Sequence, residues 1–363
     1  MNPAEIAIRR LTSQQIVERR FANVKDLAGW MGGMQAQDYD MAKWAIGLRL
    51  PNSTDQQIET AINNGEIIRT HVLRPTWHFV SADDVYWMLG LTAQRIKASM
   101  KSRHQQLGLS EATLRQSNKI IENALRGGKH LVREELLAEL SKAKILLTEN
   151  RASHLLMWAE LNGIVCSGAT RMGKPTYAIL EERVPKKKTW DEEEALAMLA
   201  KKYFSSRGPA TLMDFVWWSG LSGGSAKKAL EITRADLISE EIDSQTYWFT
   251  DFHTNPRVNK ETVCLLPPFD EFLISYEDRS ASLAYGDWNK TVSNNGIFRP
   301  IIVVNGQVIG IWKRTIKKDT VFAETNCFKQ PDMHTLKLVE KALKQYGHYL
   351  DKQIYINHKE GDQ

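Results

Sequence analysis

A repeated order of helices followed by two short strands most constrains the fold of this 363-residue chain. The middle copy is the clearest, with helical periodicity over 111–126, 131–141 and 150–162 and strand-like runs at 164–167 and 176–180. Three helices followed by a β-hairpin is the order of a winged helix, in which the third helix is the recognition helix. An all-helical assembly with unrelated hairpins is the alternative.

Similar sets of helices and strands flank the middle copy, including helices expected near 12–20 and 24–32. After residue 260 the chain becomes rich in β-forming residues, and Asn305-Gly306 predicts a type I′ hairpin. We therefore expect an α+β fold: three tandem winged-helix units, followed by a small β-barrel or curled sheet with a C-terminal helix. The expected boundaries are 1–108, 109–185 and 189–255 for the three units and 260–363 for the barrel.

Positive charge is concentrated in the first half of the chain. The total is 48 Lys and Arg against 43 Asp and Glu, or +5, but residues 1–189 alone carry a net +8. This distribution favours a polyanion such as double-stranded DNA as partner. Arg171 and Lys174, in a Gly-containing loop between the two strands of the middle unit, are candidate DNA contacts at its wing.

Several other functions lack their sequence motifs. The chain has no phosphate-binding loop, dinucleotide fingerprint, serine-hydrolase elbow or zinc-protease motif. Its three cysteines, Cys166, Cys264 and Cys327, have no metal-ligand spacing, so we expect no metal and no cofactor. Unpaired cysteines, no signal peptide and no membrane-length apolar run favour the cytoplasm; no membrane contact and no obligate protein partner are expected.

The run Gly32-Gly33-Met34-Gln35-Ala36-Gln37-Asp38 holds the main catalytic candidates. In an extended segment after the two glycines, Gln35 and Gln37 would point the same way, about 6.5 Å apart. Two amides on one side could bracket a sugar or a water, because each offers two donors and an acceptor. Asp38 is a third candidate, as a base that activates water. Surface glutamines and a helix-capping Asp38 are the alternative.

A second candidate region is the predicted hairpin that contains Arg74-Pro75-Thr76-Trp77-His78. Arg74, Trp77 and His78 place a cation, an aromatic ring and a titratable ring close to a tight turn. Such side chains can enter a DNA groove or stack on bases. Core packing of Trp77 and a structural, backbone-bonded His78 are the alternatives.

These two segments resemble the AlkZ/YcaQ-like winged-helix DNA glycosylases, as do Leu265-Leu266-Pro267-Pro268-Phe269-Asp270-Glu271-Phe272-Leu273 and the run from Arg299-Pro300 to Trp312. The resemblance extends over about residues 5 to 350. It implies tandem winged helices and a C-terminal β-barrel around a basic, DNA-sized channel. It also implies excision of alkylated purines, in some members from interstrand crosslinks, with Gln35 and Gln37 at the positions of the catalytic Q-x-Q pair.

Two glutamines suit only a reaction with a good leaving group. Glutamine is not a base at neutral pH, but its amide can orient a water and place a dipole near developing positive charge. A purine alkylated at N7 or N3 is cationic and leaves as a neutral base, so it needs no acid. Without a nucleophilic amine in the motif, we expect a monofunctional glycosylase that leaves an abasic site. A non-enzymatic DNA-binding regulator and a protein-interaction scaffold are the competing functions.

Overall fold

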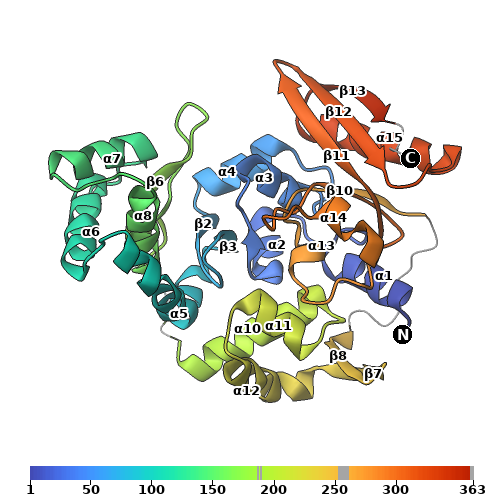
Figure 1. Ribbon diagram of the computed structural model, residues 1–363, viewed down its shortest axis with the longest axis horizontal. Helices are drawn as coiled ribbons and strands as arrows, with labels where there is room; N and C mark the ends of the chain where they lie inside the picture. Colours follow the sequence, from blue (N-terminus) through green and yellow to red (C-terminus); the bar gives the residue numbers. More distant parts are fainter. Residues whose placement is uncertain (186–187, 189, 252–260, 360–363) are drawn as a thin grey trace.

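The computed structural model describes residues 1–185, 188, 190–251 and 261–359 of the chain. One order of elements occurs three times in it: a helix, a short extended segment, two helices and a β-hairpin. In Figure 1 the middle copy (green) lies on one side of the first copy (blue), and the C-terminal sheet (orange to red) lies on the other. The predicted boundaries at 189, 255 and 260 fall outside the described residues.

The first copy begins one helix earlier than the recurring order requires. Asn2 and Glu5 form a capping box next to Pro3, which starts a helix there. The helix expected near 12–20 is therefore wrong, because the capped helix ends at Ser13 and most of that stretch follows it. Strand β3 lies between β1 and β2. The elements are α1 (Pro3–Ser13), α2 (Val24–Met31), β1 (Met34–Gln35), α3 (Tyr39–Gly47), α4 (Asp55–Asn63), β2 (Ile67–His71), β3 (Trp77–Ser81) and α5 (Val85–Gln106).

The middle copy has the same sheet order, with β6 between β4 and β5. Its first helix starts at the N-cap Ser110, whose side chain accepts a hydrogen bond from the backbone N–H of Thr113. The expected helices and strands are all present, although Leu131 and Val132 form a strand rather than the start of a helix. The elements are α6 (Glu111–Leu125), β4 (Leu131–Val132), α7 (Arg133–Lys142), α8 (Arg151–Leu161), β5 (Val165–Ser167), β6 (Thr176–Ile179) and α9 (Leu180–Arg183).

The third copy replaces the first strand by a single bridge between Ala210 and Trp248. Capping boxes at Asp191 and Thr211 start its first two helices. Its helices and hairpin follow the order expected for the third unit. They are α10 (Glu192–Arg207), α11 (Leu212–Ser219), α12 (Gly223–Thr233), a 3₁₀ turn η1 (Arg234–Asp236), β7 (Ile238–Ile242) and β8 (Gln245–Phe249).

The C-terminal region forms a five-stranded sheet in the order β13-β12-β11-β10-β9. Asn305 and Gly306 both have positive φ, as the predicted hairpin turn requires. The edge strands β9 and β13 do not pair within the described residues, so no closed barrel is found there. The elements are β9 (Val263–Leu266), α13 (Glu271–Ile274), η3 (Tyr285–Asp287), α14 (Trp288–Thr291), β10 (Ile301–Val304), β11 (Gln307–Lys317), β12 (Thr320–Cys327), α15 (Met333–Tyr349) and β13 (Gln353–Lys359).

The edge strand β13 joins β12 in parallel. A parallel pair needs a crossover connection, and α15 provides it. This helix buries Leu343 and Tyr346 in the same core as Trp312 of β11, so that core is covered by a helix instead of by closure of the sheet. No helix in the described ranges is long and apolar enough to cross a membrane.

Two of the hydrophobic cores join parts of the chain that are distant in sequence. One contains side chains of the first copy together with side chains of the C-terminal sheet, such as Leu27 and Leu266. The second joins the hairpin β2–β3 and α5 to α10–α12, with Val80 and Trp218 among its members. The middle copy has a core of its own, centred on Leu136 and Leu155. The hairpin β2–β3 and the strand β1 beside it therefore lie where the other parts meet.

Candidate active site

Gln35 lies on β1, a strand of two residues that depends on the glycines before it. Gly32 ends α2 with φ at 71°, a conformation that favours glycine. A Cβ at Gly33 would lie 2.9 Å from Leu73 Cδ1, so a side chain there would require the Leu73 side chain to shift. The two glycines thus allow β1 to approach the hairpin, where Gln35 pairs with His78 of β3.

A buried ion pair holds β1 on the side opposite the hairpin. The backbone N–H of Gln35 donates to Glu271 Oε1 over 2.8 Å, and Glu271 Oε2 accepts from Arg207 Nη2 over 2.7 Å. Arg207 also donates to the carbonyl oxygens of Met31 and Gly33, each over 2.6 Å. We call Glu271 and Arg207 the β1 clamp. It consists of one residue from the third copy and one from α13, both fully buried.

The carboxylate of Glu271 is ionised despite its burial. Burial alone would raise its pKa, but the charge of Arg207 and the hydrogen bonds from Ser275, Arg207 and Gln35 N–H outweigh it and lower the pKa to about 2. Trp218 Nε1 donates to the same carboxylate over 3.1 Å. Glu271 therefore accepts from Gln35 N–H, Arg207, Trp218 and Ser275, as an ionised carboxylate can.

The side chain of Gln35 is oriented by Arg74. Arg74 Nη2 donates to Gln35 Oε1 over 3.2 Å, so the amide oxygen faces the guanidinium and the NH₂ group faces away. Arg74 is half-buried, and burial lowers its pKa. Arg74, which we expected to contact DNA, thus contacts Gln35, the first catalytic candidate.

Gln37 departs from the expected geometry. The extended segment ends at Gln35, and Gln37 lies in a bend before α3 with its side chain exposed. Asp38 is the N-cap of α3, where its Oδ1 accepts from Met41 N over 3.2 Å. The expectation of one extended segment through both glutamines is therefore wrong for Gln37, while the alternative of a capping Asp38 is confirmed.

Trp77 lies against groups that the sequence did not single out. Arg69 stacks on its ring with the guanidinium carbon 4.2 Å from a ring centroid, and Trp77 Nε1 donates to Glu160 over 3.4 Å. Glu160, from α8 of the middle copy, is also 2.6 Å from His71 Nδ1. Arg69 Nε donates to Ala36 O, so this cluster borders the Gln35–Gln37 segment.

The hollow beside Trp77 is too small for a base. Tyr39, Trp77 and Tyr177 line it together with Arg69 and Glu160, and its volume is about 40 Å³. That volume holds one or two waters. This hollow therefore does not accommodate a nucleobase.

His78 is fully buried beneath the hairpin. Its Nδ1 donates to Thr76 O over 2.9 Å, and Nε2 has no hydrogen-bond partner among the described residues. Burial, together with the charge of Arg74, lowers its pKa to about 3, so the ring is neutral at physiological pH. This is the structural role that the sequence left open. A DNA contact of His78 stays a prediction that this burial does not support.

Replacement of His78 should flatten the acid dependence of stability. The unfolded state binds a proton on this ring below about pH 6.5, whereas the folded state binds it only near pH 3, so stability falls as pH falls between these values. The contribution reaches about 1.4 kcal/mol per pH unit. In His78→Asn, which keeps a donor for Thr76 O, urea unfolding at pH 6.5 and at pH 5 should give a smaller difference than in the wild type. An equal difference would contradict the neutral, buried ring.

Arg171 and Lys174 lie at the tip of the hairpin β5–β6, as expected. They form a bridge around Met172 and Gly173, both with positive φ, and all four are exposed. Arg171 pairs with Glu135, whereas Lys174 has no ion pair within the described residues. The structure does not bring these two residues into contact with Gln35.

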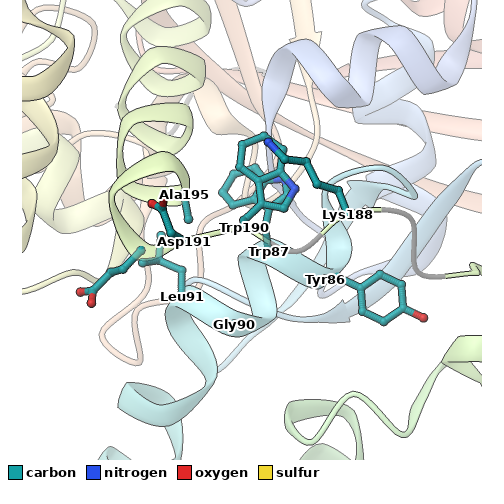
Figure 2. A pocket seen from close by; sticks show the side chains of 9 residues that line it. Tyr86, Trp87, Gly90, Leu91, Lys188, Trp190, Asp191 and Ala195 are labelled. Carbon is teal, nitrogen blue, oxygen red and sulfur yellow. The ribbon is translucent and has the colours of Figure 1, made fainter.

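Another hollow, of about 470 Å³, lies between α5 and the start of α10. Trp87 and Trp190 pack against each other there with ring centroids 5.6 Å apart, and Lys188 stacks on Trp190, as Figure 2 shows. None of the residues that line it contacts Gln35 in the structure. Across the described residues, no group of three or more His, Cys, Asp or Glu could hold a metal ion.

Comparison with known proteins gives one consistent result. Residues 28–349 match a family model described as DNA glycosylase AlkZ-like. An "Interstrand DNA cross-link repair glycosylase" of Streptomyces sahachiroi is 23% identical over 322 residues, which cover 84% of this chain and 85% of that protein. The solved structure of Streptomyces sahachiroi DNA glycosylase AlkZ is similar with a TM-score of 0.80 at 19% identity, and the match covers 99% of this chain and 100% of that one.

Proposed function

Because this chain belongs to the AlkZ-like DNA glycosylase family, we propose that it hydrolyses the N-glycosidic bond of cationic alkylated purines, of the N7-alkylguanine type, at Gln35 and Gln37. The curated relative is named for interstrand crosslinks, and we extend that substrate class to this chain. The observation that carries the proposal is the fixed Gln35, held at its backbone by Glu271 and at its amide by Arg74.

The fixed amide suits a hydrolysis in which the base leaves without protonation. Arg74 occupies one acceptor position of Gln35 Oε1, and a carbonyl oxygen has a second one for a water. Gln37, exposed beside it, supplies a second amide near the sugar. Neither amide can take a proton, so the water attacks only when the C1′–N bond is already weak. Uracil and other neutral lesions should therefore be poor substrates.

Incubation with duplex DNA that contains N7-methylguanine tests the proposal. We expect free N7-methylguanine and an abasic site, with no strand cleavage by the protein itself. Absence of release from alkylated and crosslinked DNA, with DNA binding retained, would favour a non-enzymatic DNA-binding protein instead.

We infer that the three recurring units act as winged-helix DNA-binding modules, with the hairpin β5–β6 as one wing. The recurring order of helix, short strand, two helices and hairpin supports this, as does the net +8 of residues 1–189. Arg74 and Trp77 flank the lesion in this proposal, while Arg171 and Lys174 contact the phosphate backbone of double-stranded DNA.

Replacement of Arg171 and Lys174 by Ala should weaken binding to every DNA sequence and reduce its salt dependence. Each phosphate contact contributes about 0.9 to the slope of log K against log salt, so the double variant should lose between about 1 and 2. Titration of labelled duplex at several salt concentrations measures this slope. Lys337→Ala with Lys341→Ala, on exposed positions of α15, is the matched control. An unchanged slope would remove this wing from the interface.

A further inference from the structure

Two neighbouring tryptophans of α11 face opposite ways. Trp218 is fully buried and donates to Glu271 of the β1 clamp. Trp217 is 44% exposed, and its Nε1 donates to Ile274 O over 2.9 Å. Trp217 therefore presents a ring to solvent from the same helix that supports the strand of Gln35, and one hydrogen bond fixes its orientation.

Arg279 lies among Trp217 and two further rings. Its guanidinium carbon is 5.1 Å from the centroid of Trp217, 5.5 Å from that of Trp288 and 5.3 Å from that of Phe298. Nε donates to Leu273 O and Nη1 to Glu277 O, each over 2.9 Å. Nη2 has no hydrogen bond in the part of the chain that the structure describes. Arg279 is therefore held in place by its other nitrogens, while the N–H groups of Nη2 stay available beside the exposed rings. We call Trp217, Trp288 and Arg279 the aromatic ledge.

The aromatic ledge borders the candidate active site. Gly220 ends α11, and a Cβ there would lie 2.5 Å from Leu73 O and 3.4 Å from Arg74 Cγ. The end of α11 thus touches the turn that carries Arg74, the partner of Gln35 Oε1. Trp217 lies on α11 and Trp288 on α14, and in Figure 1 α13 lies between these two helices.

Further exposed apolar side chains lie in the segments that carry the ledge. Trp288 is 38% exposed, Ile297 52% and Tyr285 98%. Exposed aromatic side chains that gather beside an active site indicate a binding surface. Rings with an adjacent guanidinium are the chemistry that stacks on nucleobases in single-stranded DNA. The exposed carboxylates of Glu277 and Asp278 disfavour a phosphate there, so the base is the part of the nucleotide that fits.

We propose that the aromatic ledge is a subsite for one unpaired nucleobase of the DNA substrate. The base stacks on Trp217 and Trp288, and Arg279 Nη2 donates to an acceptor on its edge. This subsite rests on the proposed function in that the ligand is DNA. It adds a place for a base that leaves the stack beside the lesion, which the small hollow at Trp77 does not offer.

Binding to undamaged DNA tests the subsite without any excision. The probes are a perfect duplex and the same duplex with one bulged adenine. We expect the wild type to bind the bulged duplex more tightly, and Trp217→Ala to weaken that binding about tenfold while changing affinity for the perfect duplex less than twofold. Trp217→Phe keeps a ring and should retain most of the preference.

Tyr355→Ala is the matched control, because Tyr355 is 60% exposed and stacks on Phe322 in the C-terminal sheet. It should keep the full preference for the bulge. Equal binding of both duplexes by the wild type, or a preference that survives both Trp217→Ala and Trp288→Ala, would overturn the subsite. A retained bulge preference without release of N7-methylguanine would overturn the proposed function alone.

Discussion

Gln35→Ala should lower the rate of N7-methylguanine release by about 100-fold or more, and Gln37→Ala should lower it by less, because the side chain of Gln37 is exposed; the fold and the affinity for DNA should stay nearly unchanged in both. A preorganised polar group at a site of developing charge contributes about 2.7 kcal/mol or more to the barrier. Gln35 has such preorganisation, because Arg74 orients its amide and Glu271 holds its backbone. Single-turnover release with enzyme in excess measures the chemical step without interference from product dissociation.

Gln37→Glu is the informative control for the second glutamine. Its carboxylate could replace the amide dipole and also activate the water, so it should retain more activity than Gln37→Ala. Asp38→Asn removes the charge of the third candidate and keeps a capping side chain for α3. Wild-type rates in both alanine variants, with a slow Asp38→Asn, would move catalysis from the glutamines to Asp38.

Local sequence signals predicted most of the recurring fold. Helices with side-chain caps and hairpins with turn residues depend on neighbours a few positions away, and the expected helices and strands of the middle copy agree with the structure to within two residues. The capping box of Asn2 and Glu5, with Pro3 between them, is also a local sequence signal, and it predicts a helix that begins at Pro3. The parallel pairing of the edge strand β13 was not predictable in this way, because it depends on the tertiary packing of the crossover helix α15.

The candidate site was predictable only in part, for the same reason. The sequence singled out Gln35, Gln37 and the hairpin, but not the groups that hold them. Glu271 lies 236 positions from Gln35 along the chain, and Glu160 lies 89 from His71. No periodicity or short spacing signals such pairs. The sequence alone indicates Arg74 as a DNA contact. Its actual partner, Gln35 Oε1, lies on β1, and no local pattern pairs β1 with the hairpin.

Glu271→Gln should lower both stability and the rate of release, whereas the neighbouring Asp270→Asn should lower stability alone. Each change removes the charge from a buried pair: Glu271 with Arg207, and Asp270 with Arg49 over 2.8 and 2.9 Å. An uncompensated buried arginine costs about 3–5 kcal/mol of folding free energy. Of these two pairs, only the first contacts β1 and the residue before it, through Gln35 N–H and Gly33 O, so only its loss should displace Gln35.

We expect release to slow at least tenfold in Glu271→Gln and to stay within about twofold of wild type in Asp270→Asn, because a displacement of about 1 Å at a reacting group can cost 100-fold. Urea unfolding at several temperatures identifies one at which both variants are folded, and single-turnover release is measured at that temperature. Acid titration gives a second readout. The pKa of Glu271 is about 2 when folded and near 4.5 when unfolded, so its stabilisation is present above pH 4.5 and lost towards pH 2, a dependence that Glu271→Gln should lack. Equal slowing of release in both variants would show that the β1 clamp acts through overall stability and does not position Gln35.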